Sequence, residues 1–190
     1  MSDPHTIIVH CSATQPEWMQ GETLWQKRQE IKRWHTSRGW RDIGYHWLID
    51  RDGTETHGRD WTEQGAHVRG HNQGTIGICL IGGHGSNAND DFHDHFTDAQ
   101  EAALIERVEW LRDKFPSIRE VTGHNQYAAK ACPGFQVQKW YPQARKDYLV
   151  GDIAPEVAPS VPFDWHELHQ LLDEIDMRTR QIRDMMEHMG

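Results

Sequence analysis

Near the start of the chain lies Ile7-Ile8-Val9-His10-Cys11-Ser12-Ala13-Thr14, a short apolar run with a histidine at its end. Because Ile7 to Val9 are apolar on both faces, this stretch predicts a strand in the middle of a sheet. A histidine on such a strand has two interpretations. It is a ligand if other donors converge on it, and otherwise a hydrogen-bonded core residue.

A second informative stretch is Gly123-His124-Asn125-Gln126-Tyr127-Ala128-Ala129-Lys130-Ala131-Cys132-Pro133. Two imidazoles, from His10 and His124, and the thiolate of Cys132 would form a donor set that suits Zn2+, with one position left for water as in catalytic zinc sites. Lys130 precedes Cys132 by two residues, so on an extended segment both side chains point the same way. A cation there would stabilise the oxyanion of a tetrahedral intermediate. By spacing alone, Cys132 is also typical of a small core residue.

Strands alternate with helices over residues 1–150, which predicts an α/β domain with a mixed central β-sheet flanked by helices. Arg51-Asp52-Gly53 is a strong hairpin signal, and Thr97 with Gln100 predicts a capping box at the start of a helix. Besides 7–9, the predicted strands are 45–50, 54–58, 75–81 and 120–122, and the predicted helices are 23–38 and 97–115.

We expect different roles for the other reactive side chains. Tyr45 supplies a phenol that can donate a proton to an oxyanion or orient a water. Cys11 and Cys79 are expected to be small core residues, with Cys11 on the opposite face of its strand from His10. A polar loop over 84–96 contains three histidines that we expect to be solvated: His84, His93 and His95.

The composition restricts the classes of function. The 190 residues carry a net charge of −9, which argues against a broad nucleic-acid-binding surface. No apolar run is long enough to span a bilayer, and the N-terminal residues show no basic region followed by an apolar core. Three cysteines are too few for a disulfide framework. We therefore expect a soluble protein, cytoplasmic in the producing cell, with reduced thiols and no integral membrane segment.

Several motifs in a fixed order resemble the zinc-dependent N-acetylmuramoyl-L-alanine amidases of the amidase-2 family, which also includes the peptidoglycan recognition proteins. The resemblance covers roughly residues 6–142 and is strongest to the small amidases of T-odd coliphages. The motifs are Val9-His10-Cys11-Ser12-Ala13-Thr14, Gly39-Trp40-Arg41-Asp42-Ile43-Gly44-Tyr45-His46, Arg51-Asp52-Gly53-Thr54, Gly65-Ala66-His67, Thr75-Ile76-Gly77-Ile78-Cys79-Leu80-Ile81-Gly82-Gly83, Phe96-Thr97-Asp98-Ala99-Gln100 and Lys130-Ala131-Cys132-Pro133.

The resemblance implies one Zn2+ per chain held by His10, His124 and Cys132, with Tyr45 and Lys130 as catalytic partners. It implies hydrolysis of the amide between N-acetylmuramic acid and the L-alanine of the stem peptide in peptidoglycan. His67 falls where similar proteins place a substrate-contacting histidine. Such an enzyme, made without an export signal, would be a phage endolysin that reaches the cell wall once the inner membrane is permeabilised.

A different class of function stays open. The chain could be a peptidoglycan-binding or polymerase-regulating module on the amidase fold, because some relatives only bind peptidoglycan and a phage relative regulates its phage's RNA polymerase. Those that only bind have lost the metal-binding cysteine, so the presence of Cys132 favours the enzyme. A general zinc peptidase is disfavoured by the absence of a His-Glu-x-x-His motif.

The last part of the chain departs from the resemblance. We divide the chain into an amidase catalytic domain over 1–150, a Pro-rich linker over 151–162 and an amphipathic helix over 163–190. Over 165–189, residues at alternating steps of four and three, all apolar except Thr179, are typical of a heptad seam. That helix could fold back onto the domain or support self-association, while its acidic character disfavours a membrane-active tail.

Overall fold

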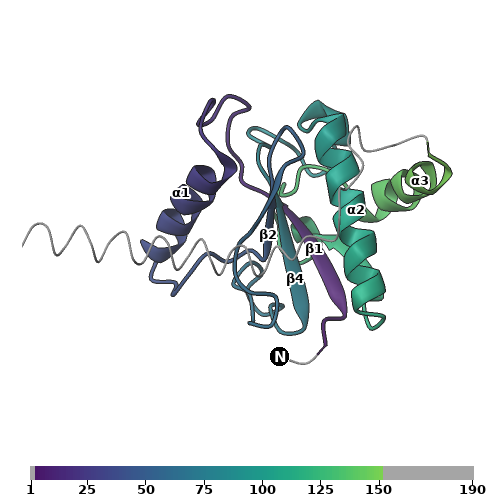
Figure 1. Ribbon diagram of the computed structural model, residues 1–190, viewed down its shortest axis with the longest axis horizontal. Helices are drawn as coiled ribbons and strands as arrows, with labels where there is room; N and C mark the ends of the chain where they lie inside the picture. Colours follow the sequence, from purple (N-terminus) through teal and green to yellow (C-terminus); the bar gives the residue numbers. More distant parts are fainter. Residues whose placement is uncertain (1–2, 152–190) are drawn as a thin grey trace, which may run out of the picture. The chain divides into compact units, whose positions relative to one another are not determined.

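The computed structural model describes residues 3–151, and in this part of the chain a five-stranded sheet lies between helices (Figure 1). Most of the predicted linker over 151–162, and all of the predicted helix over 163–190 with its seam over 165–189, lie outside the described residues. The domain division and the self-association therefore stay predictions.

The sheet is mixed, as predicted. Its strands are β1 (Thr6–Cys11), β2 (Trp47–Ile49), β3 (Glu55–His57), β4 (Thr75–Leu80) and β5 (Glu120–Gly123), in the order β3-β2-β4-β1-β5. Strands β2, β4, β1 and β5 run parallel to one another, and only the hairpin strand β3 is antiparallel to its neighbour. Because β1 has a parallel partner on each side and all six of its residues are buried, the prediction of an inner strand is confirmed.

Three helices cover the sheet: α1 (Leu24–Thr36), α2 (Asp98–Lys114) and α3 (Val137–Val150). The capping box predicted at Thr97 is present, since its hydroxyl accepts from the backbone N–H of Gln100. Helix α3 was not predicted, because Pro142 lies in its interior and proline ordinarily marks a helix boundary. Two short 3-10 turns, η1 (Phe92–Asp94) and η2 (His124–Gln126), complete the described elements.

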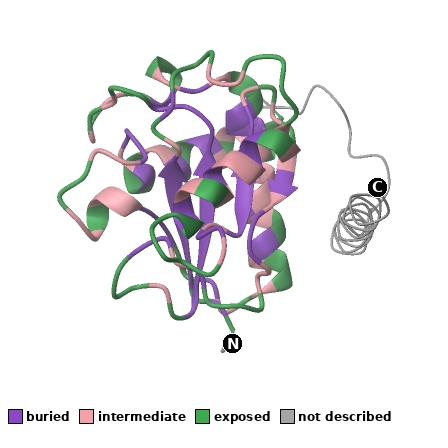
Figure 2. Cartoon of the chain, turned by 90° about the vertical axis from the view of Figure 1, so that its left-hand side faces the viewer, coloured by how far each residue is buried: buried purple, intermediate pink, exposed green. Residues whose placement is uncertain are grey.

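The two faces of the sheet pack against different helices (Figure 1). One face joins strand residues such as Val9 and Leu80 to Leu104 of α2 and Val137 of α3. The opposite face packs against Ile31 of α1. Figure 2 shows the strands as the buried centre of the domain. The sheet is thus covered on both sides, as its mostly parallel strands require.

The loop over 84–96 is less solvated than predicted. Phe92 and Phe96 are buried in the core, and His95 is half-buried with Nε2 2.7 Å from a carboxylate oxygen of Asp90. The expected solvation is therefore wrong for His95, whereas His84 and His93 are exposed. The two phenylalanines draw the loop into the core because their apolar area outweighs the polar residues around them.

Two buried histidines make the domain sensitive to acid. His35 and His46 each accept a backbone N–H at Nδ1, from Gly44 (3.0 Å) and Gly77 (2.9 Å) respectively. Burial lowers the pKa of each ring from 6.5 to about 4. The unfolded chain therefore binds more protons between those values, so stability is complete above pH 6.5 and falls as the pH drops towards 4. We expect a loss of about 3 kcal/mol per ring at most.

The measurement is urea denaturation at pH 7.5 and pH 4.5, in the presence of a chelator so that metal release does not contribute. His46→Asn keeps an acceptor for the Gly77 N–H but cannot be protonated, so its free energy of unfolding should depend less on pH. His84→Asn, at an exposed position, is the matched control and should behave like the unaltered protein. Equal pH dependence in both variants would contradict the role of His46.

Candidate metal centre

The topology of the sheet brings the two predicted histidine ligands together. Strands β1 and β5 are parallel neighbours, with Val9 directly opposite Gly123. His10 and His124 each follow one residue later, so both lie at the carboxyl end of their strands. This edge of an open α/β sheet is where functional sites usually form. The two imidazole rings are 4.8 Å apart between centroids.

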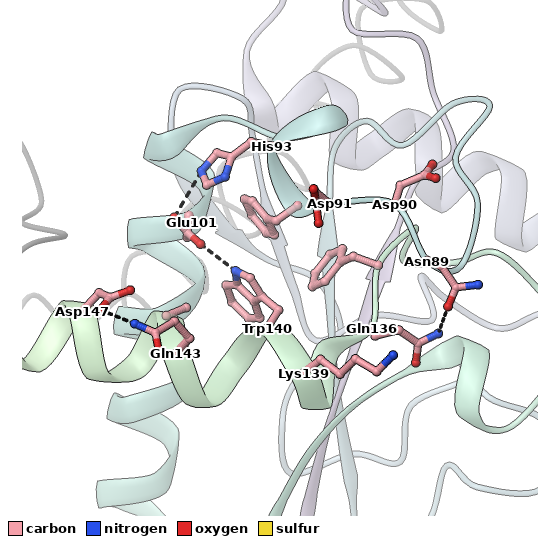
Figure 3. Close-up of a pocket in the computed structure, with 13 residues that line it drawn as sticks. Asn89, Asp90, Asp91, His93, Glu101, Gln136, Lys139, Trp140, Gln143 and Asp147 are labelled. Carbon is pink, nitrogen blue, oxygen red and sulfur yellow. Dashed lines mark hydrogen bonds and ion pairs between the residues drawn. The ribbon is translucent and has the colours of Figure 1, made fainter.

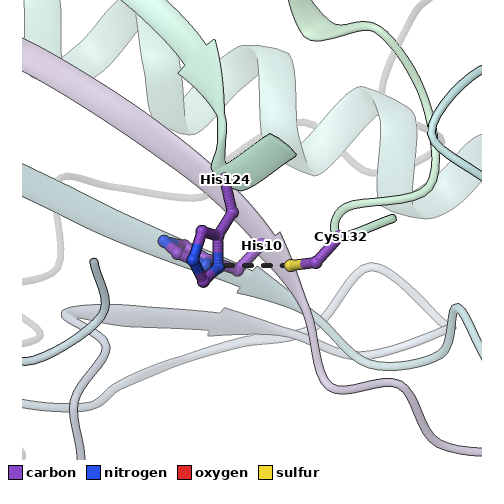
Figure 4. Close-up of side chains that lie close together, drawn as sticks. All are labelled: His10, His124 and Cys132. Carbon is purple, nitrogen blue, oxygen red and sulfur yellow. Dashed lines mark hydrogen bonds between the residues drawn. The ribbon is translucent and has the colours of Figure 1, made fainter. Parts of the chain in front are cut away.

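Cys132 reaches the same place from the loop between η2 and α3. The backbone N–H of Asn125 donates to the Cys132 carbonyl at 2.7 Å, which ties this loop to the turn that carries His124. The Cys132 Sγ lies 3.8 Å from the Nδ1 of His10 and accepts the backbone N–H of Cys11 at 3.3 Å. One donor atom from each of His10, His124 and Cys132 lies within 4.8 Å of the other two (Figure 4).

The protonation states of this cluster suit a metal cation. Burial lowers the pKa of His10 well below its usual value, with further contributions from His67 and His124, and burial likewise lowers the pKa of His124. Both rings are therefore neutral near pH 7 and offer lone pairs. The pKa of the Cys132 thiol is raised by its hydrogen bond with Cys11 and then by burial. A bound cation would overcome this shift and hold the thiolate.

Tyr45 and Lys130 lie next to this cluster. The Tyr45 ring is 5.1 Å from the His10 ring between centroids, and burial raises the pKa of its phenol well above 10, so the phenol keeps its proton. Lys130 is exposed, and its positive charge helps to lower the pKa of both His10 and His124. The Lys130 N–H donates to the Ala128 carbonyl at 2.8 Å, so the chain turns at Ala129, and the shared direction of the Lys130 and Cys132 side chains stays a prediction.

His67 lies behind His10, where it is only 6% exposed. Its Nδ1 is 3.0 Å from the His10 Nε2, and its own Nε2 is 3.3 Å from the hydroxyl of Thr75. The substrate contact expected of His67 stays a prediction. Sequence reasoning missed Thr75 as a neighbour of the site, and also the contact of Cys11 with Cys132, because neither has a signal in the local sequence.

A cavity of about 880 Å3 lies elsewhere, between the loop over 84–96, α2 and α3 (Figure 3). Several of its polar side chains are hydrogen-bonded to one another: Glu101 accepts from the Trp140 indole at 2.6 Å, and Gln143 donates to Asp147 at 2.7 Å. None of the three clustered donors lines it. The cluster of His10, His124 and Cys132 and this cavity are therefore two separate places in the fold.

The fold and this group of donors define a class of hydrolase, and a comparison with known families agrees. The chain belongs to the N-acetylmuramoyl-L-alanine amidase family Amidase_2, whose family model matches residues 1–135. It is an enzyme of this amidase class, and the resemblance seen in the ordered motifs is confirmed.

Within the family, phage endolysins are close relatives. The chain is 40% identical over 134 residues to the endolysin of Enterobacteria phage K11, covering 70% of this chain and 83% of that protein. It is 39% identical over 135 residues to the endolysin of Escherichia phage T7, covering 71% and 83%. Among solved structures, the N-acetylmuramoyl-L-alanine amidase LysC from Clostridium intestinale URNW superposes with a TM-score of 0.59 at 26% identity, covering 77% of this chain and 86% of LysC.

Proposed function

We propose that this chain is a zinc-dependent endolysin that hydrolyses the amide between N-acetylmuramic acid and L-alanine in peptidoglycan. The observation that carries the proposal is the convergence of His10, His124 and Cys132. Two neutral imidazoles and one thiolate are the ligand types that zinc prefers, and three protein donors leave a position for the reaction. Zinc, when bound there, would polarise a carbonyl and acidify a water molecule.

Side chains of the protein would then stabilise the negative charge that develops on the carbonyl oxygen. The Tyr45 phenol, which keeps its proton, can donate a hydrogen bond to the oxygen on which negative charge develops. Lys130 would hold its positive charge at the same oxygen, from the exposed side of the site. As the C–N bond breaks, the leaving amine of L-alanine would take up the proton that the attacking water gives up. We assign neither Tyr45 nor Lys130 as the sole general base.

The enzyme and its substrate would start in different compartments of the cell. No helix among the described residues has the length and apolar character needed to cross a membrane. We propose that the enzyme collects in the cytoplasm of the producing cell and meets its substrate after other proteins permeabilise the inner membrane. The endolysin relatives from phages K11 and T7 support this role in host lysis.

The test is mass spectrometry of purified peptidoglycan after digestion with the zinc-loaded protein. We expect free stem peptides that begin with L-alanine, together with intact glycan strands. Cleavage within the glycan or within the stem peptide would contradict the assigned bond. Unchanged peptidoglycan, from protein shown to contain zinc, would instead support the peptidoglycan-binding or polymerase-regulating module.

A further inference from the structure

We infer that His67 and Thr75 form a positioning relay that fixes the tautomer of His10, so that its Nδ1 lone pair is directed at the metal position. This inference rests on the proposed function only in so far as His10 is a metal ligand. A histidine can bind a metal through either nitrogen, and the nitrogen that carries the proton is set by the hydrogen bond made on the other side of the ring. The relay supplies that bond from inside the fold.

The hydrogen bonds of Thr75 decide which atoms donate and which accept along the relay. The Thr75 hydroxyl donates its proton to the His71 carbonyl at 2.8 Å, so towards His67 its oxygen can only accept. The contact between this hydroxyl oxygen and the Nε2 of His67, at 3.3 Å, therefore requires a proton on that Nε2. Thr75 is only 3% exposed, so water does not compete for this contact.

The contact between His67 and His10 then fixes the proton on His10. With its proton on Nε2, His67 has a lone pair on Nδ1, which lies 3.0 Å from the Nε2 of His10. His10 must then be the donor in this contact, and its own proton is on Nε2. The remaining lone pair of His10 is on Nδ1, the nitrogen that faces the Cys132 Sγ at 3.8 Å. The opposite tautomer would direct an N–H at the metal position and would prevent coordination there.

The sheet leaves space for this relay. At Gly77, in strand β4, an added Cβ would lie 2.7 Å from the Cγ of His67. Gly65 is similarly constrained, because its Cβ would lie 2.6 Å from the His67 Cδ2. The His67 ring therefore packs directly on backbone at both positions. The absence of a side chain at Gly77 holds His67 within reach of His10, whose ring is fully buried.

The experiment compares His67→Leu with His67→Asn. Leucine removes the acceptor for the His10 Nε2–H, and we expect zinc affinity, measured by competition with a chromophoric chelator, to fall by about 10–100-fold. Asparagine places an amide oxygen close to the position of the imidazole Nδ1, so it should retain most of the affinity. Thr6→Val is the matched control. It removes a buried hydroxyl from strand β1, directly opposite Thr75 but outside the relay, and should leave affinity unchanged.

A second readout needs no metal. In the metal-free protein at neutral pH, 15N chemical shifts of the histidine rings should show the His10 proton on Nε2, and His67→Leu should mix the two tautomers. A proton on the His10 Nδ1 in the unaltered protein would overturn the relay, as would an unchanged zinc affinity in folded His67→Leu protein. If the unaltered protein bound no zinc, the proposed function would fail while the tautomer measurement would still decide the relay.

Discussion

Replacing Cys132 by serine should remove zinc and amidase activity together. The thiolate is the one anionic donor in the cluster, and a serine hydroxyl stays protonated and binds zinc poorly. We expect zinc affinity to fall by more than the ~10–100-fold that outer partners of a ligand contribute. Release of L-alanyl peptides from peptidoglycan should fall to the level of the metal-free enzyme.

Two measurements check this result. Equilibrium dialysis gives the zinc content, and thermal unfolding with and without a chelator gives the stabilisation by bound metal, which should be present in the unaltered protein and lost in Cys132→Ser. Ala131→Ser is the matched control, because it places a hydroxyl one residue earlier in the same turn. A Cys132→Ser protein that holds one zinc per chain and still cleaves would refute the assignment of Cys132 as a ligand.

The fold could be predicted where local pattern and tertiary structure agree. In three places a few neighbouring residues are enough to predict the local structure. These are the strand at Ile7 to Val9, the hairpin turn at Arg51-Asp52-Gly53 and the helix start at Thr97. Helix α3 could not be predicted in this way, because Pro142 contradicts the local pattern. Its stability comes from packing of Val137 and Tyr141 against the core, which no local window contains.

The candidate site likewise has parts that the local sequence predicts and parts that depend on the tertiary structure. His124 and Cys132 lie within one short stretch, so their pairing is visible in the sequence. The approach of His10 to His124 needs the register of β1 on β5, which the resemblance supplied and local spacing did not. The contacts of Thr75 with His67, and of Cys11 with Cys132, depend on how side chains pack in three dimensions. Those partners could be found only in the structure.

Replacing Lys130 by alanine should have the opposite signature from Cys132→Ser, with zinc retained and turnover greatly reduced. Lys130 is not among the clustered donors, and its charge opposes any other cation beside His10 and His124. Its removal should therefore leave zinc affinity unchanged or slightly higher. Loss of one group that stabilises the developing oxyanion typically costs about 10²–10³-fold in kcat.

Lys130 and Lys139 provide a matched comparison, because both are exposed lysines and of the two only Lys130 lowers the pKa of His10 and His124. Lys139→Ala should keep normal kcat and normal zinc content. Lys130→Arg, which preserves the positive charge, should recover part of the lost rate if charge is what matters, whereas a role in proton transfer would leave it as slow as alanine. Wild-type turnover in a zinc-loaded Lys130→Ala protein would remove Lys130 from the mechanism and leave Tyr45 as the side chain that faces the developing charge.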